Sequence, residues 1–390
     1  MKLMIVDEEL IAGGVEAIQL NVIPELCAQV EKLYWFLPSA RIEYFRVRIG
    51  AIENLTFISL DFSTNFLFRL LSWGRNKSIW GREKLLLFLR NQRLKQFYRR
   101  MSVDACITTC MFEQAPFPEG MRRGGILCDL NVQGERRVSF LHNIKQWVEN
   151  SEIVFPISKY TEKELCRNFP VFSSRFKTVP LAANVSKNKN RLWEKKGTVF
   201  YYPASIMPHK NHYLLLRAFE KLLCKGDDLK LILTGGGTEK LVQAGNSEKH
   251  VIRCRDLIQD ESNELSKVVQ AYGYIDTQEV DRLYAQASCI ILPSAMEGYG
   301  LPLAEALAFG KPVICSDIEP FREQADLYHA DNRVIFFKNN SLDSLVQAIE
   351  SFLLKPLVAM SYSEIEDLMQ RWTFKNVANS YLQELQGTLK

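Results

Sequence analysis

The chain has 390 residues, 47% of them hydrophobic and 24% charged, with a net charge of +4. This composition excludes a disordered chain, which combines low hydrophobicity with high net charge, and the length exceeds that of one ordinary core. No apolar stretch approaches the roughly 18 residues of a spanning helix, and the one after Met1 is too short for a signal peptide. Nine cysteines without a CxxC pair favour a reducing compartment. We therefore expect a cytoplasmic protein of two domains.

Short apolar runs alternate with segments of helical periodicity, which predicts parallel sheets built from strand-helix-strand units. The first run, KLMIV (2–6), reads as a strand that is followed by a glycine turn and a helix within 12–30. Further strands or short helices of the first half are expected at NLTFISLD (54–61), ACITTC (105–110), RRVSF (136–140) and EIVFPIS (152–158).

The segment 73–101 is strongly basic, with nine arginines and lysines against one glutamate, and aromatic residues lie between them. A helix here carries Leu87, Leu94, Phe97 and Met101 on one side, a pattern typical of a helix lying on an anionic membrane surface. The alternative is a core-facing helix whose charged side is solvated. Peripheral attachment to the inner face of a membrane therefore stays open.

The second half shows a clearer alternation after a polar, basic stretch at 187–197 that we interpret as a linker. Strands are predicted at TVFYYPA (198–204), LKLILTGGG (229–237), YGYI (272–275), SCIILPS (288–294) and KPVICSD (311–317). Helices are predicted at 213–225, 277–287 and 301–310. The carboxyl ends of parallel strands form the edge where open α/β sheets bind ligands.

The turn after SCIILPS has the features of an anion site. Gly298 and Gly300 remove side chains from the approach, so the backbone N–H groups of Gly300 and Leu301 can point at an anion. Pro302 stands in the first helical turn, where its missing N–H costs nothing. A phosphate group fits such a helix start.

Two carboxylates flank this turn, Glu297 at its lip and Glu305 inside the helix. Together with Lys210 in the MPHKNH loop and the glycine turn at 235–237, they suit a ligand with hydroxyls on both sides of a diphosphate, such as a nucleotide sugar. Each feature also has an ordinary explanation: a carboxylate on a helix dipole, a solvated loop lysine, a tight turn. Three of them at strand ends in one half of the chain favour a binding site.

The stretch 272–317, with Glu297 and Glu305 in E-x7-E spacing, resembles the donor-binding domain of retaining glycosyltransferases of family four. These have the α/β GT-B fold, two Rossmann-like parallel-sheet domains facing a central cleft. VDEELIAGGVEAIQLNVIPEL (6–26), VFPISKYTEKELCRNF (154–169) and RWTFKNVANSYLQEL (371–385) are similar to other parts of the family. The resemblance implies an acceptor-side domain at 1–188, joined by a C-terminal helix at 373–390, and a donor-binding domain at 189–372.

The resemblance also implies residue roles. Glu297 contacts the donor hexose and Glu305 the ribose, while Lys210 and the helix amides hold the diphosphate. The backbone of 273–275 faces the base, and Gly13 and Gly14 shape the first domain's side of the cleft. The full set of expected site residues is Glu297, Lys210 and Asp129 for catalysis, and Glu305, Gly300, Leu301, Tyr299, Gly298, Gly235, Gly236, Tyr274, Ile275, Ser205, Gly13 and Gly14 for donor binding.

Two positions depart from the family pattern. Cys128 replaces the histidine of a His-Asp pair before Asp129, and Ser205 with Ala204 stand where an arginine commonly assists the lysine. His209 and His212 flank Lys210, as phosphate contacts or as solvent-facing residues.

The implied activity is a metal-independent, retaining transfer of a hexose from a UDP- or GDP-sugar to a glycan or lipid-linked acceptor. The chain has no DxD motif and no Cys/His ligand spacing, and we expect no metal, no cofactor and no nucleic-acid partner. Two alternatives stay open: a non-catalytic nucleotide-sugar-binding subunit of a membrane polysaccharide assembly, and a sugar-nucleotide epimerase of the same fold.

Overall fold

The computed structural model describes residues 1–8, 14–61, 79–111, 117–130, 132, 136–183, 198–226, 228–243, 245, 247–330, 332–357 and 360–387, without the side chains of 79–84, 86 and 136. The chain divides into two compact units, Met1–Leu181 with Phe374–Lys390, and Ala182–Thr373. The expected linker at 187–197, the expected domain boundary at 188 and 189, and Gly13 lie outside the described residues.

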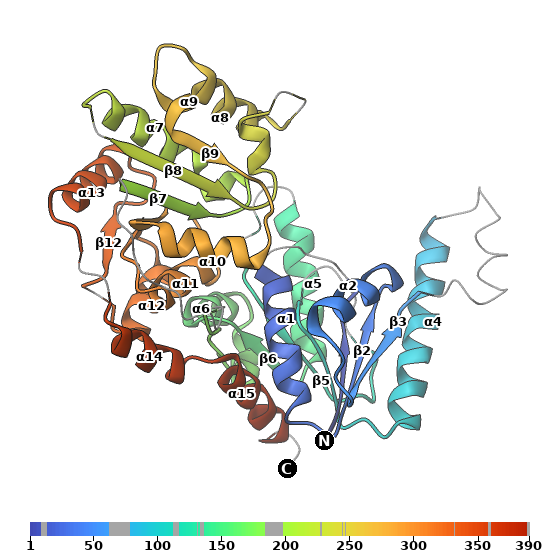
Figure 1. The fold of residues 1–390 in the computed structure, drawn as a ribbon. Helices are drawn as coiled ribbons and strands as arrows, with labels where there is room; N and C mark the ends of the chain where they lie inside the picture. Colours follow the sequence, from blue (N-terminus) through green and yellow to red (C-terminus); the bar gives the residue numbers. More distant parts are fainter. Residues whose placement is uncertain are drawn as a thin grey trace. The chain divides into compact units, whose positions relative to one another are not determined.

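The first unit is built on a parallel sheet of six strands in the order β3-β2-β1-β4-β5-β6 (Figure 1). Leu3 of β1 pairs with Leu33 of β2 on one side and Ala105 of β4 on the other, so the first strand lies in the middle of the sheet. The strands are β1 (Lys2–Val6), β2 (Lys32–Leu37), β3 (Leu55–Ser59), β4 (Ala105–Thr108), β5 (Arg123–Leu127) and β6 (Ile153–Pro156).

Helices cover this sheet, and the last helix of the chain, α15, packs along α1 (Figure 1). The Ser158 hydroxyl caps α6 by accepting a hydrogen bond from the Thr161 backbone N–H at 3.0 Å. The helices are α1 (Gly14–Cys27), α2 (Ser39–Ile49), α4 (Ile79–Arg100), α5 (Arg136–Asn150), α6 (Lys159–Asn168), the short 3-10 helix η1 (Pro170–Arg175) and α15 (Phe374–Gly387).

The two halves of helix α4 differ in burial, and this bears on the two interpretations of the basic segment. Leu94 is buried, and Phe97 and Met101 pack against the same core, as a core-facing helix requires. One turn or more earlier, Leu87 and Phe88 are 39% and 56% exposed. The apolar side predicted for 73–101 is therefore wrong as a continuous membrane face, because its carboxyl half belongs to the core.

The second unit repeats the architecture with a parallel sheet in the order β12-β11-β10-β7-β8-β9. Its strands are β7 (Thr198–Pro203), β8 (Leu229–Thr234), β9 (Val269–Ala271), β10 (Cys289–Leu292), β11 (Val313–Ser316) and β12 (Val334–Phe337). Strands β10 and β11 are buried at every position, which explains why they read as unbroken apolar runs and not as alternating ones.

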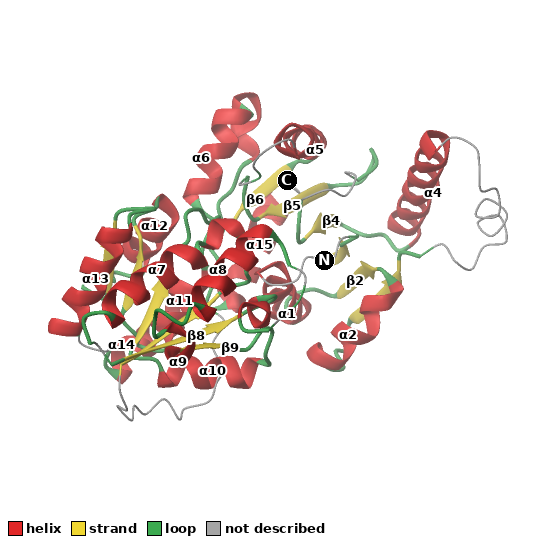
Figure 2. Cartoon of the chain, turned by 90° about the horizontal axis from the view of Figure 1, so that it is seen from above, coloured by secondary structure: helices red, strands yellow, loops and turns green. Residues whose placement is uncertain are grey.

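Helices lie on both faces of this second sheet (Figures 1 and 2). Helix α7 contacts α8 and α13 on one face, and α11 contacts α12 and α14 on the other. The helices are η2 (Pro208–Lys210), α7 (His212–Leu223), η3 (Thr238–Leu241), α8 (Lys249–Gln259), α9 (Leu265–Val268), α10 (Thr277–Gln286), α11 (Leu301–Ala308), α12 (Glu319–Leu327), α13 (Leu342–Leu354) and α14 (Tyr362–Arg371).

One choice left open by the sequence is decided, and one local prediction needs correction. RRVSF (136–140), expected as a strand or a short helix, is the first part of the 15-residue helix α5. YGYI (272–275) is not a strand: β9 ends at Ala271, and Gly273 has a φ of +74°, which leaves the extended region. The four residues therefore form a loop at the carboxyl end of β9.

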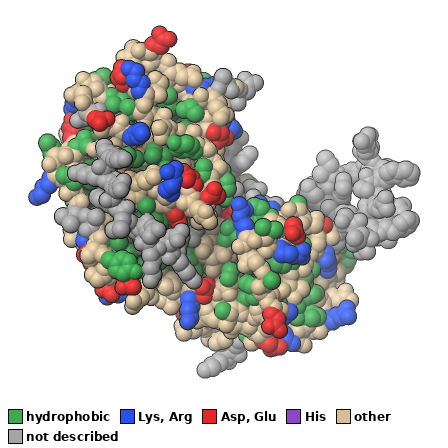
Figure 3. Space-filling view, in the orientation of Figure 1, with side chains coloured by type: hydrophobic (Ala, Val, Ile, Leu, Met, Phe, Trp, Pro, Cys, Tyr) green, Lys and Arg blue, Asp and Glu red, His purple; other side chains and the backbone are tan. Residues whose placement is uncertain are grey.

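On the face shown in Figure 3, basic and acidic side chains are interspersed. Among the residues that the structure describes, no helix combines the length and the apolar character needed to cross a bilayer.

Candidate functional site

The loops that follow the central strands of the second unit are hydrogen-bonded to one another. The Ala295 N–H donates to the carbonyl of His209 at 2.7 Å, which joins the loop after β10 to the loop after β7. The Gly235 N–H donates to the carbonyl of Gly273 at 2.7 Å, which joins the loops after β8 and β9. Parallel strands thus bring four predicted motifs to one edge of the sheet.

Lys210 and Glu297 form an ion pair at this edge. Lys210 Nζ lies 2.6 Å from Glu297 Oε1, and the two side chains are only 18% and 12% exposed. An ion pair that water reaches poorly is screened less than a surface pair. The structure therefore brings together the two residues that the sequence assigned to diphosphate and hexose.

Tyr202 holds the lysine loop in place, a contact that the sequence did not reveal. Its hydroxyl donates to the carbonyl of Lys210 at 2.7 Å and lies 3.1 Å from the hydroxyl of Ser294. Burial raises the pKa of Tyr202 well above its usual value, so the phenol stays protonated and keeps its donor. This tyrosine ties the ends of β7 and β10 together.

The amino end of α11 has no side-chain cap. Gly300 is the N-cap residue and has no side chain to cap the helix, and in the described part of the chain the amides of Gly300 and Leu301 donate to no protein acceptor. Gln324 Nε2 donates to the carbonyl of Tyr299 and, at 3.2 Å, to that of Gly300, which fixes the turn from below. The helix start therefore keeps two backbone donors for a ligand.

Gly300 is required by its neighbours as well as by any ligand. Its φ is +91°, in the left-handed region, and a Cβ there would collide with the ring of Phe321. The packing of Phe321 therefore requires glycine at position 300, and the predicted ligand approach stays a prediction.

We expect Gly300→Ala to lower the free energy of unfolding by about 1–3 kcal/mol, because alanine is strained at this φ and the Phe321 ring must move. Urea unfolding followed by circular dichroism measures the change. Gly236→Ala is the matched control, because a Cβ at Gly236 meets nothing within 4 Å. Equal midpoints for the two variants contradict the prediction.

Tyr299 does not present its side chain to a ligand. The ring is 3% exposed, and its hydroxyl lies 3.0 Å from that of Tyr328. Its predicted place among the donor-binding residues is corrected to a core position, with only the backbone at the turn.

Glu305 is held by a tyrosine from the neighbouring helix. The Tyr284 hydroxyl donates to Glu305 Oε2 at 2.7 Å, and the Tyr284 ring stacks on Phe309 with centroids 5.1 Å apart. Desolvation raises the pKa of Glu305 to about 7, which the Tyr284 hydrogen bond lowers in part and the charge of Asp281 raises. The second oxygen, Oε1, receives no donor from the described residues. One oxygen is thus positioned by Tyr284, and the ribose contact expected of the other stays a prediction.

The glycine turn after β8 is explained mainly by the chain itself. A Cβ on Gly235 would lie 2.5 Å from the carbonyl carbon of Ala204 and 2.7 Å from the backbone nitrogen of Ser205, and its φ is +116°. The backbone of Ala204 therefore accounts for glycine at position 235, whereas Gly236 is open, and ligand binding at this turn stays a prediction. Ser205 lies in this close contact and brings no charge to replace an arginine.

The loop after β9 presents Tyr274, which is 63% exposed, while Ile275 packs partly against the core. The Gly273 N–H donates to the hydroxyl of Thr238 at 3.0 Å. The carboxylate of Glu239, which the sequence did not single out, lies against Gly273.

Of the two histidines that flank Lys210, His212 has a buried ring. His212 is 3% exposed, and its ring packs on Tyr202 with centroids 4.8 Å apart. Burial lowers the pKa of His212 to about 3, so it is neutral. The expectation of a solvent-facing or phosphate-contacting His212 is therefore wrong.

The remaining predicted residues belong to the first unit. Asp129 is partly buried in the segment after β5, and Gly14 is the exposed first residue of α1. Asp7, directly after β1 in the same unit, is buried. It accepts hydrogen bonds from Trp35 Nε1 at 2.8 Å and from the Thr109 N–H at 2.8 Å, so it joins the carboxyl ends of β1, β2 and β4. Asp7 is a structural carboxylate that the sequence did not indicate.

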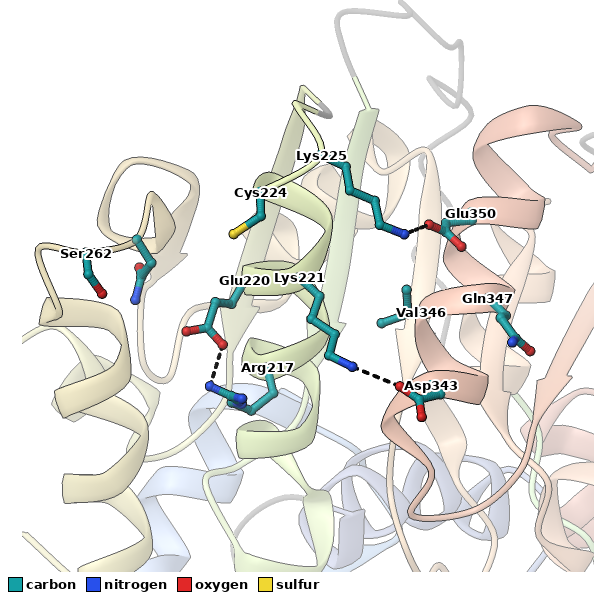
Figure 4. A pocket seen from close by; sticks show the side chains of 11 residues that line it. Arg217, Glu220, Lys221, Cys224, Lys225, Ser262, Asp343, Val346, Gln347 and Glu350 are labelled. Carbon is teal, nitrogen blue, oxygen red and sulfur yellow. Dashed lines mark hydrogen bonds and ion pairs between the residues drawn. The ribbon is translucent and has the colours of Figure 1, made fainter.

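A groove of about 600 Å³ between α7 and α13 lies away from this edge (Figure 4). Its charges are compensated within the groove, since Lys221 Nζ contacts Asp343 Oδ1 at 2.9 Å. The same close-up shows two further pairs, Arg217 with Glu220 and Lys225 with Glu350. We therefore place the candidate site at the strand ends.

Parts of the chain are similar to known glycosyltransferases. Residues 185–367 match the family model described as "Glycosyl transferases group 1". The O-antigen chain mannosyltransferase B of Escherichia coli is 25% identical over 250 residues, 59% of this chain and 58% of that protein. The serotype-specific mannosyltransferase WbdA of Escherichia coli is 28% identical over 218 residues, 55% of this chain and 24% of that protein. The chain thus spans less than two thirds of the length of these relatives.

Solved structures match along the whole chain. A glycosyltransferase from Rickettsia africae has a TM-score of 0.71 at 15% identity, covering 100% of this chain and 98% of that chain. A sucrose-phosphate synthase from Thermosynechococcus elongatus has a TM-score of 0.70 at 16% identity, covering 100% and 99%. Identities this low show the fold alone. The chain has the α/β GT-B fold with two Rossmann-like parallel sheets, and this confirms the predicted fold class.

Proposed function

We propose that this chain is a retaining glycosyltransferase that moves a hexose from a nucleoside diphosphate sugar to an acceptor hydroxyl in the synthesis of a bacterial surface polysaccharide or glycolipid. The observation that carries the proposal is the ion pair of Lys210 and Glu297 beside the uncapped amino end of α11. The match to a glycosyltransferase family model and to two O-antigen or serotype-specific mannosyltransferases supports it.

Each residue at the strand ends has a role in this proposal. Lys210 and the amides of Gly300 and Leu301 hold the diphosphate, since donors fixed before the reaction stabilise developing charge without reorganisation. When the donor binds, its diphosphate replaces Glu297 as the partner of Lys210, and Glu297 then binds hexose hydroxyls. Glu305 accepts hydrogen bonds from the ribose through its unoccupied oxygen.

The reaction follows from these positions. The bond between the anomeric carbon and the diphosphate oxygen breaks, and its electron pair leaves with the diphosphate. The acceptor oxygen forms the new bond on the same face, and its proton passes to an oxygen of the leaving phosphate. Asp129, in the first unit, is assigned to the acceptor side. Since no protein carboxylate attacks the sugar and the cation is a lysine, the mechanism needs no metal.

The absent arginine is the observation that favours a second candidate, a non-catalytic nucleotide-sugar-binding subunit. Ser205 stands at the position where the family commonly has this cation. Both candidates bind the nucleotide-sugar donor, but only the glycosyltransferase transfers its sugar. An epimerase of the same fold differs from both, because it changes the sugar without an acceptor.

A panel of UDP- and GDP-hexoses tests the function. We expect saturation-transfer NMR to detect at least one donor, and nucleoside diphosphate release to increase when glycan or lipid-linked acceptors are added. Proton NMR of the product then gives the anomeric configuration, which should equal that of the donor. No binding of any donor rejects all three candidates, binding without release leaves the subunit, and inversion rejects the retaining mechanism.

We also propose that the amino half of α4 contacts an anionic membrane surface, where a lipid-linked acceptor would be found. Leu85, Leu87 and Phe88 are exposed large apolar residues, and the segment around them is rich in arginine and lysine. Arg90 is not part of this surface, because it is buried against Glu8.

The full-length protein should float with vesicles containing phosphatidylglycerol and less with neutral vesicles. The double variant Leu87→Glu, Phe88→Glu should lose most of this association, because it removes apolar area and adds like charge. Val138→Glu is the control, since Val138 is 79% exposed on α5. Absence of wild-type flotation, or equal flotation of the double variant, contradicts the membrane proposal and leaves the enzymatic one intact.

A further inference from the structure

The side chain of Glu239 fits where it lies only because residue 273, which it contacts, is a glycine. It lies in η3, directly after the glycine turn of β8, and its side chain rests against Gly273 at the end of β9. A Cβ on Gly273 would lie 2.6 Å from Glu239 Oε2 and 3.2 Å from its carboxyl carbon. The loop expected to face the nucleobase therefore receives a carboxylate from the neighbouring strand end.

This carboxylate lacks a hydrogen-bond partner. Oε2 of Glu239 is shielded from solvent, and no donor among the described residues reaches it. Two donors of the same loops have other acceptors: the Gly273 N–H donates to the Thr238 hydroxyl, and that hydroxyl donates to the carbonyl of Gly235 at 2.9 Å. Buried polar atoms without partners are rare in native proteins, and a shielded carboxylate oxygen without a donor is costly. A ligand with N–H groups satisfies it.

The glycine turn that precedes Glu239 has open space at one position. Gly236 is exposed, and a Cβ there would meet no atom within 4 Å. Tyr274, 63% exposed, follows Gly273 directly. An exposed glycine and an exposed aromatic ring therefore lie in the two loops that Glu239 joins.

Among the nucleobases, guanine matches a carboxylate best. Its Watson–Crick edge presents two adjacent donors, N1–H and the N2 amino group, which fit the two oxygens of one carboxylate. Uracil offers one N–H between two carbonyl oxygens, and these oxygens face a carboxylate with like partial charge. Adenine and cytosine each place an acceptor beside their amino donor.

We propose that Glu239 reads the Watson–Crick edge of guanine and makes the donor a GDP-sugar in preference to a UDP-sugar. The inference rests on the proposed function, because it assigns the base of the same nucleotide whose diphosphate lies at Lys210. Glu239 is a specificity-determining residue here and takes no part in bond breaking.

Isothermal titration of the full chain with GDP, UDP and inosine diphosphate tests the assignment. Inosine diphosphate lacks only the N2 amino group, so it probes the second hydrogen bond without changing the protein. We expect the wild type to bind GDP roughly 5- to 100-fold more tightly than UDP, the range of one good bidentate contact to a base. Inosine diphosphate should bind several-fold more weakly than GDP.

The variant Glu239→Gln should lose most of the preference for GDP over both other nucleotides, because its amide NH₂ opposes the guanine donors. Its affinity for UDP should change less than about threefold, within the scatter of a preserved diphosphate site. Glu261→Gln, at an exposed glutamate of the same unit, is the matched control and should keep the wild-type preference.

The outcomes separate the two proposals. Equal or tighter binding of UDP by the wild type overturns the role of Glu239 while the nucleotide-sugar function stands. A GDP preference that survives in Glu239→Gln also overturns it. If the variant does not fold, equal wild-type affinities for GDP and inosine diphosphate overturn the bidentate contact on their own. Failure of every nucleotide to bind the wild type rejects both proposals.

Discussion

Lys210→Met should lower kcat by about 10²–10³-fold, the range seen when one preorganised electrostatic contact to a developing charge is removed. Contacts to both the backbone and the side chain of Lys210 fix its position. Tyr202 holds its carbonyl at 2.7 Å, and its ammonium group lies at the ion pair with Glu297. Methionine keeps most of the volume and removes the charge, so the loss reports electrostatics and not packing.

The measurement is nucleoside diphosphate release at saturating donor, with affinity for the free nucleoside diphosphate measured separately. Lys355→Met is the matched control, because Lys355 is exposed in the same unit, and it should keep wild-type turnover. A thermal melt of each variant shows whether the fold persists, since Lys210→Met leaves Glu297 half-buried without its cation. Wild-type turnover in a folded Lys210→Met variant contradicts the assigned role.

The pairing of Lys210 with Glu297 shows where sequence reasoning stops. Both residues stand at strand ends in the sequence, and the parallel topology is enough to predict a common edge of the sheet. The 2.6 Å contact between them depends on how the loops after β7 and β10 are hydrogen-bonded, as in the bond from Ala295 to His209. Such loop-to-loop contacts leave no periodic signal in the chain.

The glycines illustrate a second limit. A glycine in a sequence indicates either a left-handed φ or a close approach, but it does not say which atom approaches. At Gly235 the neighbour is the backbone of Ala204, and at Gly300 it is the ring of Phe321. At Gly236 no atom lies within 4 Å of a Cβ, so neighbouring atoms do not explain this glycine.

Secondary structure was predictable where burial was uniform and less so elsewhere. β10 and β11 are buried at every position and were recognised from their apolar runs. RRVSF was ambiguous because five residues are too few to distinguish a strand from the start of α5. Tyr284 and Glu239 were missed because each is an ordinary residue of a short helical segment until its partner in another element is known.

Glu305→Gln should remove a pH dependence from the stability of the protein. The usual pKa of a glutamate here is 4.5, and desolvation raises that of folded Glu305 to about 7. Because the folded pKa is the higher one, the folded state holds a proton that the unfolded state has released between these values. The contribution of protonated Glu305 to the free energy of unfolding is fully present below pH 4.5 and is lost as the pH rises through 7. The difference between the two pKa values corresponds to about 3 kcal/mol.

Urea unfolding at several pH values between 4 and 8.5 measures this difference between wild type and variant. Other groups titrate in the same range, but they are present in both proteins, so the difference belongs to Glu305 and its surroundings. Tyr284→Phe provides the directional control: it removes a donor that lowers the pKa of Glu305, so the loss of stability should move to higher pH. If the difference in the free energy of unfolding between wild type and Glu305→Gln does not change with pH, the raised pKa of Glu305 is contradicted.

The same titration has a consequence for the nucleotide. A carboxylate accepts hydrogen bonds from two ribose hydroxyls, whereas a protonated carboxyl group has only part of that capacity. Binding to the ribose therefore favours the ionised form, and affinity for a nucleoside diphosphate should increase as the pH rises through about 7 in the wild type more than in Glu305→Gln. Because the phosphates titrate equally in both experiments, their contribution cancels in the comparison. Parallel pH profiles for the two proteins would show that Glu305 does not touch the ribose, even if its pKa is raised as the structure indicates.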